Sequence, residues 1–264
     1  MGASLILGAL VGVIMGLTGA GGGILAVPLL VFGLHLTVAS AAPLGLLAVG
    51  IAAAMGAAVG LRAGVVRYRA ALLIALTGIV FNPLGLWLAA RMPVRYLTLL
   101  FAVVLVVVAA KGLREVRLAG SQSRHQAACP CHLDETTGRL DWNARCATRL
   151  SLMGAAAGML SGLLGVGGGF VIVPALQHFS DLAMRSIVAT SLAVIALISL
   201  SGVAATIHSG QFDLALGLPF ATGASAGMLL GGRLASRWPP ASLKLAFSLI
   251  CLAVACGLIG KTLL

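Results

Sequence analysis

The sequence predicts an all-α integral membrane protein with about 8 to 10 membrane segments, arranged as two inverted repeats with helices broken at glycine-rich runs. Three observations predict this fold class. The chain of 264 residues is 60% hydrophobic and only 9% charged, which is far more apolar than an ordinary soluble domain. Its charged residues lie between long apolar runs. One glycine-rich motif occurs twice, and the loops that follow its two copies differ in charge.

The repeated motif occupies residues 16–28 and returns over 162–174, which is 146 positions later. The residues of the first copy that recur unchanged are Gly16, Leu17, Gly19, Gly21, Gly22, Gly23, Val27 and Pro28. Glycines outside the motif recur at the same offset. The chain is therefore predicted to be a duplicated half, with a first membrane repeat over 1–113, a basic connector over 114–148 and a second repeat over 149–264.

Each expected membrane segment follows from a stretch without Asp, Glu, Lys or Arg. Such stretches occupy 1–61, 70–90, 96–110, 150–180, 186–212, 214–232 and 245–260. In the first half they predict a helix over 5–18, a glycine break over 19–23, a short helix over 24–34, and segments over 37–61, 70–90 and 94–112. The second half predicts a helix ending at the second glycine run, then segments over 170–180, 184–208, 214–235 and 241–260. Pro83 lacks an amide N–H and is expected to open the fourth segment beside Asn82.

The distribution of basic residues predicts the orientation. The loop 62–69 carries three arginines, and two membrane segments separate it from the basic connector, so both are expected in the cytoplasm. The equivalent loop of the second half, 208–213, has no Lys or Arg. The second half is therefore expected to be inserted upside down, with both termini outside. Many secondary transporters are built this way and bind substrate near the membrane midplane.

The glycine runs are the first candidate site. Glycine lets successive backbone N–H groups turn inward, and the helix that follows each run adds the partially positive end of its dipole. We therefore expect a small anion to be held by the N–H groups of Gly21, Gly22, Gly23, Gly167, Gly168 and Gly169. The alternative is that the glycines serve only tight turns and close helix packing.

Polar side chains near the runs extend this prediction. Thr190 and Ser191 have hydroxyls that could bind anion oxygens or their own backbone, and the Asn82 amide could bind substrate or repair the helix at Pro83. All six acidic residues fall in or next to loops, which favours an anion or a neutral solute over a cation. Arg185, beside Asp181, is expected to anchor the chain at the interface or to attract anions. Proton coupling, if present, would use His35, His178 or His208.

The connector contains Cys129, Cys131 and Cys146, with His132 next to the first pair. These residues could hold a metal or relay a thiol, but the CxC spacing differs from that of structural zinc sites, and reduced cytosolic thiols are expected. The net charge of +11 comes from loops between apolar runs, so nucleic acid is not an expected partner.

These motifs resemble the sulfite exporter family of the TauE/SafE type. The resemblance rests on the paired GxGGG runs with their Val-Pro steps, 16–28 and 162–174, and on the stretch Ala189-Thr190-Ser191-Leu192. The first half has Ala42-Pro43-Leu44 near the position of that stretch. The resemblance implies a multi-pass inner-membrane transporter of sulfite, sulfonates or similar sulfur-containing anions, usually outward, without enzymatic activity or a cofactor.

Several other functions are left open by the residues alone. These are transport of a neutral solute or a metal cation, a membrane thiol or metal redox protein, and a structural membrane subunit. The expected partners are a small anionic substrate and the lipid bilayer, and a homodimer is one possible assembly.

Overall fold

The computed structural model describes residues 2–19, 21–34, 36–118, 131, 133–134, 139–140, 143–180, 182–208, 214–234 and 240–263. The first half holds α1 (Gly2–Thr18), the 3-10 helix η1 (Gly21–Leu25), α2 (Ala26–Gly33), α3 (Val38–Arg62), α4 (Tyr68–Arg91) and α5 (Val94–Leu118). The second half holds α6 (Ala144–Leu164), α7 (Gly169–Phe179), α8 (Met184–His208), α9 (Leu214–Leu234) and α10 (Pro240–Leu263). Between the halves, β1 (Leu133–Asp134) and β2 (Arg139–Leu140) form a two-residue antiparallel ladder. The predicted all-helical class is confirmed.

Five described helices are long and apolar enough to cross a membrane. They are Ser40–Arg62, Tyr68–Arg91, Val94–Arg114, Ala144–Leu164 and Met184–Thr206, and three shorter apolar segments are Gly2–Thr18, Gly23–Gly33 and Leu245–Gly260. Their sum lies at the lower end of the number predicted from the charge-free stretches. Exposed leucine, valine and phenylalanine side chains cover the outside of the bundle, as expected of surfaces that face lipid.

Helix boundaries recur at the offset of the sequence motif. Val38, Tyr68 and Val94 begin α3, α4 and α5, and the residues 146 positions later begin α8, α9 and α10. The two glycine runs also interrupt the chain at equivalent places, after α1 and after α6.

Glycines let helices of different halves pack backbone to backbone. Cβ atoms built at Gly8, Gly12 and Gly16 of α1 would collide with the backbone of α9 at Phe220, Ala224 and Met228. The equivalent glycines of α6, Gly154, Gly158 and Gly162, lie in the same way against α4. Each of these glycine faces thus packs against a helix from the other half of the chain.

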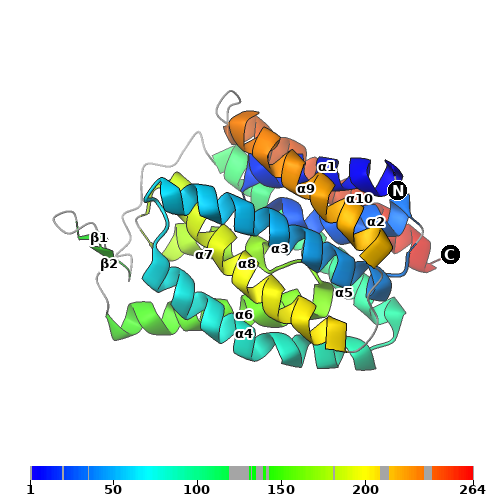
Figure 1. The fold of residues 1–264 in the computed structure, drawn as a ribbon, viewed down its shortest axis with the longest axis horizontal. Coiled ribbons are helices and arrows are strands. Elements are labelled where there is room, and N and C mark those ends of the chain that lie inside the picture. Colours follow the sequence, from blue (N-terminus) through cyan, green and yellow to red (C-terminus); the bar gives the residue numbers. More distant parts are fainter. Residues whose placement is uncertain are drawn as a thin grey trace.

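Helices α3 and α8 cross the middle of the molecule in opposite directions. Gly60 faces Ala189 and Gly50 faces Ser199, so residue numbers fall along α3 as they rise along α8. In Figure 1 the two lie side by side, with α1 and α9 on one flank and α4 and α6 on the other. Both chain ends lie at one end of the bundle, while β1, β2 and the turn between α3 and α4 lie at the other. We call these the terminal end and the connector end.

The interruption expected at Pro83 is wrong, because α4 continues through it to Arg91. A proline removes one backbone hydrogen bond but leaves those of the neighbouring turns. Here α6 packs closely on both sides of it, with Gly162 against the backbone of Asn82 and Gly85 against the backbone of Met159. This packing holds the helix through the proline.

Candidate functional site: a cationic cavity at the connector end

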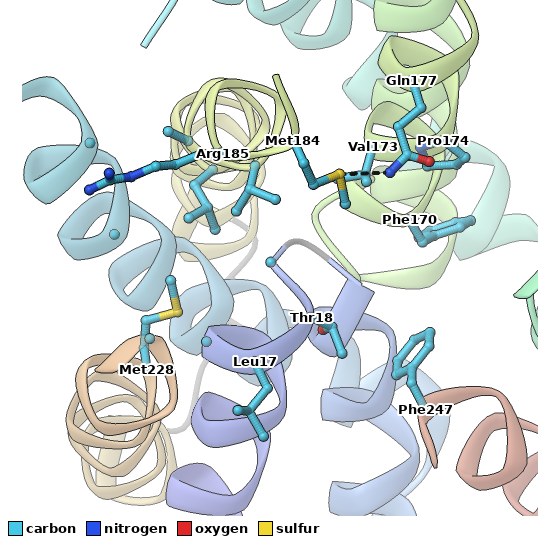
Figure 2. Close-up of a pocket in the computed structure, with 18 of the residues that line it drawn as sticks. Leu17, Thr18, Phe170, Val173, Pro174, Gln177, Met184, Arg185, Met228 and Phe247 are labelled. Atoms are coloured by element: carbon cyan, nitrogen blue, oxygen red, sulfur yellow. Dashed lines mark hydrogen bonds between the residues drawn. The ribbon is translucent and has the colours of Figure 1, made fainter. Parts of the chain in front are cut away.

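A cavity of about 690 Å³ opens among the helices at the connector end. Its walls come from both halves of the chain (Figure 2): Leu17 and Thr18 at the end of α1, Phe170 and Pro174 on α7, and Met228 on α9. Residues at the end of α3, the end of α5, the start of α8 and the first half of α10 complete it. Because those helix termini all lie at the connector end, the cavity is placed on that side of the bundle.

Four glycines, which have no side chains, form much of the inner wall. Gly16, Gly19, Gly56 and Gly60 all line the cavity. At Gly19 the backbone has a φ of +84°, a conformation that glycine adopts without strain, and it turns the chain away from α1. The hollow therefore exists where the glycine-rich sequence keeps α1 and α3 bare.

Three basic side chains line the cavity: Lys111 on α5, Arg185 on α8 and Arg233 on α9. None of the described residues that line it is acidic. Arg185 lies on the opposite side of the cavity from Phe170 and Phe247 (Figure 2). All three side chains are exposed, and their combined positive charge attracts anions to the cavity, less strongly as the salt concentration rises.

Gln177 fixes the wall where α7 and α8 meet. Its side-chain amide donates to the sulfur of Met184 at 2.9 Å, and both residues line the cavity (Figure 2). Ser180, which lies between them in sequence, donates its hydroxyl to the carbonyl of Leu176 and ends α7. The loop from α7 to α8 is thus tied to the cavity wall at both ends.

The two predicted glycine runs meet inside the molecule. A Cβ built at Gly23 would lie 3.1 Å from the carbonyl oxygen of Val166, beside the second run. Gly167 and Gly168 have φ values of +76° and +70°, and Gly168 precedes the first residue of α7. Of the predicted anion site, the glycines whose surroundings are described, Gly23, Gly167, Gly168 and Gly169, do not line the cavity, which instead reaches Gly19 before one run and Phe170 after the other. That these N–H groups bind an anion stays a prediction.

The predicted hydroxyl ligands are buried behind the cavity wall. Thr190 accepts a hydrogen bond at 3.1 Å from the backbone N–H of Arg67, and Ser191 donates to the carbonyl of Val188 at 2.8 Å. Their neighbours Ala189 and Leu192 line the cavity, whereas these two residues do not. Their role as substrate ligands stays a prediction, with both hydroxyls engaged by backbone in this structure.

Asn82 lies away from the cavity, between α4 and α8. Its Nδ2 donates to the hydroxyl of Ser201 at 3.0 Å and to the carbonyl of Ile198 at 3.3 Å. The side chain is 1% exposed, and its Oδ1 has no hydrogen-bond partner in the described part of the chain. The amide therefore links two helices and leaves one buried acceptor unsatisfied.

The coupling candidates fall outside what the structure describes. His35 and Asp181 are not among the described residues, and neither are the side chains of His178 and His208. Arg185, by contrast, is placed on the cavity. Sequence reasoning missed Lys111 and Arg233 as members of this site. The available signal was that each ends or follows a charge-free stretch whose end lies on the connector side.

The expectation of reduced connector thiols is wrong for two of the three cysteines. Cys131 and Cys146 form a disulfide with their Cα atoms 5.1 Å apart, and both are buried. The strands β1 and β2 fold the connector back so that residues 15 apart in sequence meet. Cys131 also forms an isolated parallel β-bridge with the backbone of Ser180 at the end of α7. Paired sulfurs offer no thiolate to a metal, and Cys129 lies outside the described residues.

Comparison with known proteins identifies the family of this chain. The family model described as "Sulfite exporter TauE/SafE" matches residues 4–258. The chain belongs to the sulfite exporter TauE/SafE family. It is 30% identical to a "Probable membrane transporter protein" of Xylella fastidiosa strain 9a5c over 262 residues, covering 97% of this chain and 93% of the relative. A protein with the same description in strain Temecula1 is 30% identical with the same coverage.

A third relative matches only in part. The "Probable membrane transporter protein MamO" of Magnetospirillum gryphiswaldense is 31% identical over 116 residues, which is 41% of this chain and 18% of that protein. No solved structure matches the chain. The resemblance predicted from the glycine motifs is confirmed over nearly the whole sequence, and this TauE/SafE protein is a multi-pass membrane transporter.

Proposed function

We propose that this TauE/SafE protein exports a small sulfur-containing anion, such as sulfite or a sulfonate, across the bacterial inner membrane by alternating access. The observation that carries the proposal is the cavity with Lys111, Arg185 and Arg233 and no acidic residue among its described lining. A cation would be repelled by three positive charges at the cavity, and an uncharged solute would gain little from them. A sulfur oxyanion offers several oxygens that guanidinium and ammonium groups bind strongly.

The proposed architecture is two membrane repeats of opposite orientation, 1–113 and 149–264, joined by a basic connector over 114–148. The support comes from helix starts that recur after 146 residues and from the antiparallel crossing of α3 and α8. Such halves allow a substrate site to be reached from either side in turn. The anion would enter at the connector end and pass inward to the backbone N–H groups of Gly21–Gly23 and Gly167–Gly169.

Basic residues support a cytoplasmic connector end. The basic residues of described segments at that end are Arg62, Arg67, Arg69, Lys111, Arg114, Arg117, Arg139, Arg145, Arg149, Arg185, Arg233 and Lys244. Arg91, Arg95 and Lys261 belong to segments at the terminal end. An excess of Lys and Arg in cytoplasmic loops is the general rule for membrane proteins, so the cavity would face the cytoplasm and load substrate for export.

The test is transport by purified protein in liposomes. Counterflow of radiolabelled sulfite or sulfoacetate is measured against uncharged analogues and divalent cations. We expect flux of the anions alone. Replacing Lys111, Arg185 or Arg233 singly with Gln should raise the half-saturating anion concentration about tenfold, since a hydrogen bond to a charged group contributes about 1.5–3 kcal/mol.

The matched control is Arg62→Gln, which removes a positive charge at the same end but outside the residues that line the cavity. It should leave the half-saturating concentration unchanged. Equal effects from all four substitutions would mean that only the general surface charge matters. Flux of uncharged analogues or divalent cations in place of the anions would favour the other transport classes and reject the proposal.

A further inference from the structure

The surroundings of one cavity residue recur in the other half of the molecule. Met228 lines the cavity, with Gly16 packed against its backbone and Gly56 facing its side chain; a Cβ at Gly56 would lie 2.5 Å from Met228 Cε. The residue 146 positions before Met228 is Asn82. Asn82 therefore holds in the first half the place that Met228 holds in the second.

The glycine contacts around Asn82 match those around Met228. Gly162, the counterpart of Gly16, packs against the backbone of Asn82. Gly202, the counterpart of Gly56, faces the Asn82 side chain, and a Cβ there would lie 3.0 Å from Nδ2. The same three-helix unit is thus built twice, once from α1, α3 and α9 and once from α6, α8 and α4.

The two units differ in whether they are open. The unit around Met228 opens into the cavity. In the unit around Asn82, both glycines and Asn82 are buried, and Leu46 of α3 fills the space beside Gly202. Gly165, the counterpart of cavity-lining Gly19, is closed off by Ala42. Because α3 and α8 run antiparallel, the closed unit faces the terminal end of the bundle, opposite to the end at which the cavity opens.

The closed unit contains one unsatisfied acceptor, the side-chain oxygen Oδ1 of Asn82. A buried polar atom without a partner loses its hydrogen bonds to water without replacement, and such groups are uncommon in native structures. In an apolar helical bundle Met, the residue at the equivalent position, would avoid this cost. A carbonyl oxygen cannot bind an anion, so the free Oδ1 is explained if opening of this unit lets water donate to it in another state of the protein, where Nδ2 is the group able to donate to an anion.

We infer that the unit bounded by Asn82, Gly162 and Gly202 is the closed counterpart of the cavity, which opens toward the terminal end when the cavity closes, and that Asn82 contacts the transported anion there through Nδ2. The inference rests on the proposed function, because it requires two halves that exchange conformations. It assigns Asn82 to the substrate path on one side of the membrane only. Met228 marks the same level of the path on the connector side.

Thiol labelling tests the opening without any substrate. Asn82→Cys and, as the matched position, Met228→Cys are made in a chain whose five native cysteines are replaced by Ser. A membrane-impermeant maleimide is applied to intact cells and to inverted membrane vesicles. We expect Asn82→Cys to be labelled only from the terminal face and Met228→Cys only from the connector face. Labelling of Met228→Cys without any labelling of Asn82→Cys would overturn the inference.

Ser201→Cys provides a second position if Asn82→Cys does not fold, since Ser201 accepts a hydrogen bond from Asn82 and Cys is close to it in size. It should be labelled from the terminal face. Its protection in both preparations, with Met228→Cys labelled, would also overturn the inference.

Sided kinetics separate substrate contact from a structural role. Asn82→Ala should raise the half-saturating concentration of sulfoacetate about tenfold when sulfoacetate is supplied at the terminal face. The half-saturating concentration should be unchanged when sulfoacetate is supplied at the connector face. Asn82→Gln should restore part of the difference. Equal changes at both faces would reduce Asn82 to a link between α4 and α8. If labelling shows the opening but no anion is transported, the proposed substrate fails while the second opening stands.

Discussion

At the scale of single residues, the glycines of α1 determine whether the two halves can assemble. Gly12 sits where any Cβ would collide with the carbonyl of Ala224 on α9, and neither backbone can yield without separating the helices. A change of side-chain rotamer cannot relieve this collision, because the colliding atoms belong to the main chain. Close approach of backbones replaces the hydrophobic effect that drives helix packing in water, since lipid chains are themselves apolar.

Replacing Gly12 with Ala should therefore destabilise the protein by about 1–3 kcal/mol, the usual cost of overpacking. Thermal unfolding of detergent-purified protein, followed by loss of the monodisperse elution peak, measures the effect. Gly260→Ala is the control, because a Cβ at that position meets nothing within 4 Å. This control should be neutral or slightly stabilising, as Ala is the better helix former. A melting temperature for Gly12→Ala at or above that of the control would contradict the packing described for α1 and α9.

At the same scale, the sequence alone predicted only some of the residues that line the cavity. Arg185 could be singled out because it stands beside a predicted interface, and the glycines because their pattern is repeated. Lys111 and Arg233 are separated from it by many residues in sequence, and nothing in their own surroundings shows that α5, α8 and α9 end around one hollow. The bonding of Thr190 to the backbone of Arg67 likewise depends on a contact across the fold.

At the scale of elements, helix boundaries were well predicted. The segment expected over 184–208 is α8, and the one over 214–235 is α9 with its end one residue earlier. Charges such as Arg185 bound the apolar runs and glycines end α1 and α6, so both signals are local. The break at Pro83 was mistaken because the contacts of α6 that hold α4 together are not local. The disulfide was missed because it depends on how the connector folds back.

The disulfide fastens the connector to the cavity wall, and its removal should loosen that attachment. A cross-link closing a loop of about 15 residues contributes about 3 kcal/mol in the chain-entropy description. It joins Cys131, which bridges Ser180 at the end of α7, to Cys146 in the first turn of α6. Cys146→Ser should make the connector cleave several-fold faster in limited proteolysis.

Cys251→Ser, on α10 and outside the disulfide, is the matched control and should not change the cleavage rate. Non-reducing peptide mapping of the unaltered protein should recover Cys131 linked to Cys146. Free thiols at both positions in protein purified without reductant would contradict the pairing. Unchanged proteolysis would show that β1, β2 and their contacts hold the connector without the covalent bond.

At the scale of the whole molecule, two features of the connector end point to different compartments. The concentration of Lys and Arg there favours the cytoplasm. A disulfide favours an oxidising compartment, since cytosolic disulfides in most organisms are transient or redox-sensing. The positive charges are spread over the α3–α4 turn, the end of α5 and the start of α6, so several loops independently favour the same orientation of the membrane helices. One pair of cysteines bears only on the connector, and the basic residues therefore carry more weight for orientation.

Reporter fusions in a bacterial host decide between the two orientations. Alkaline phosphatase fused after Leu264 should be active and green fluorescent protein at the same point dark, because an odd number of crossings in each half places both chain ends outside. Fluorescent protein inserted between Leu118 and Cys131 should fluoresce. The reverse pattern would place the cavity on the periplasmic face and the disulfide in an oxidising compartment. Lys111, Arg185 and Arg233 would then capture an anion from outside, and the proposed export would have to be replaced by uptake.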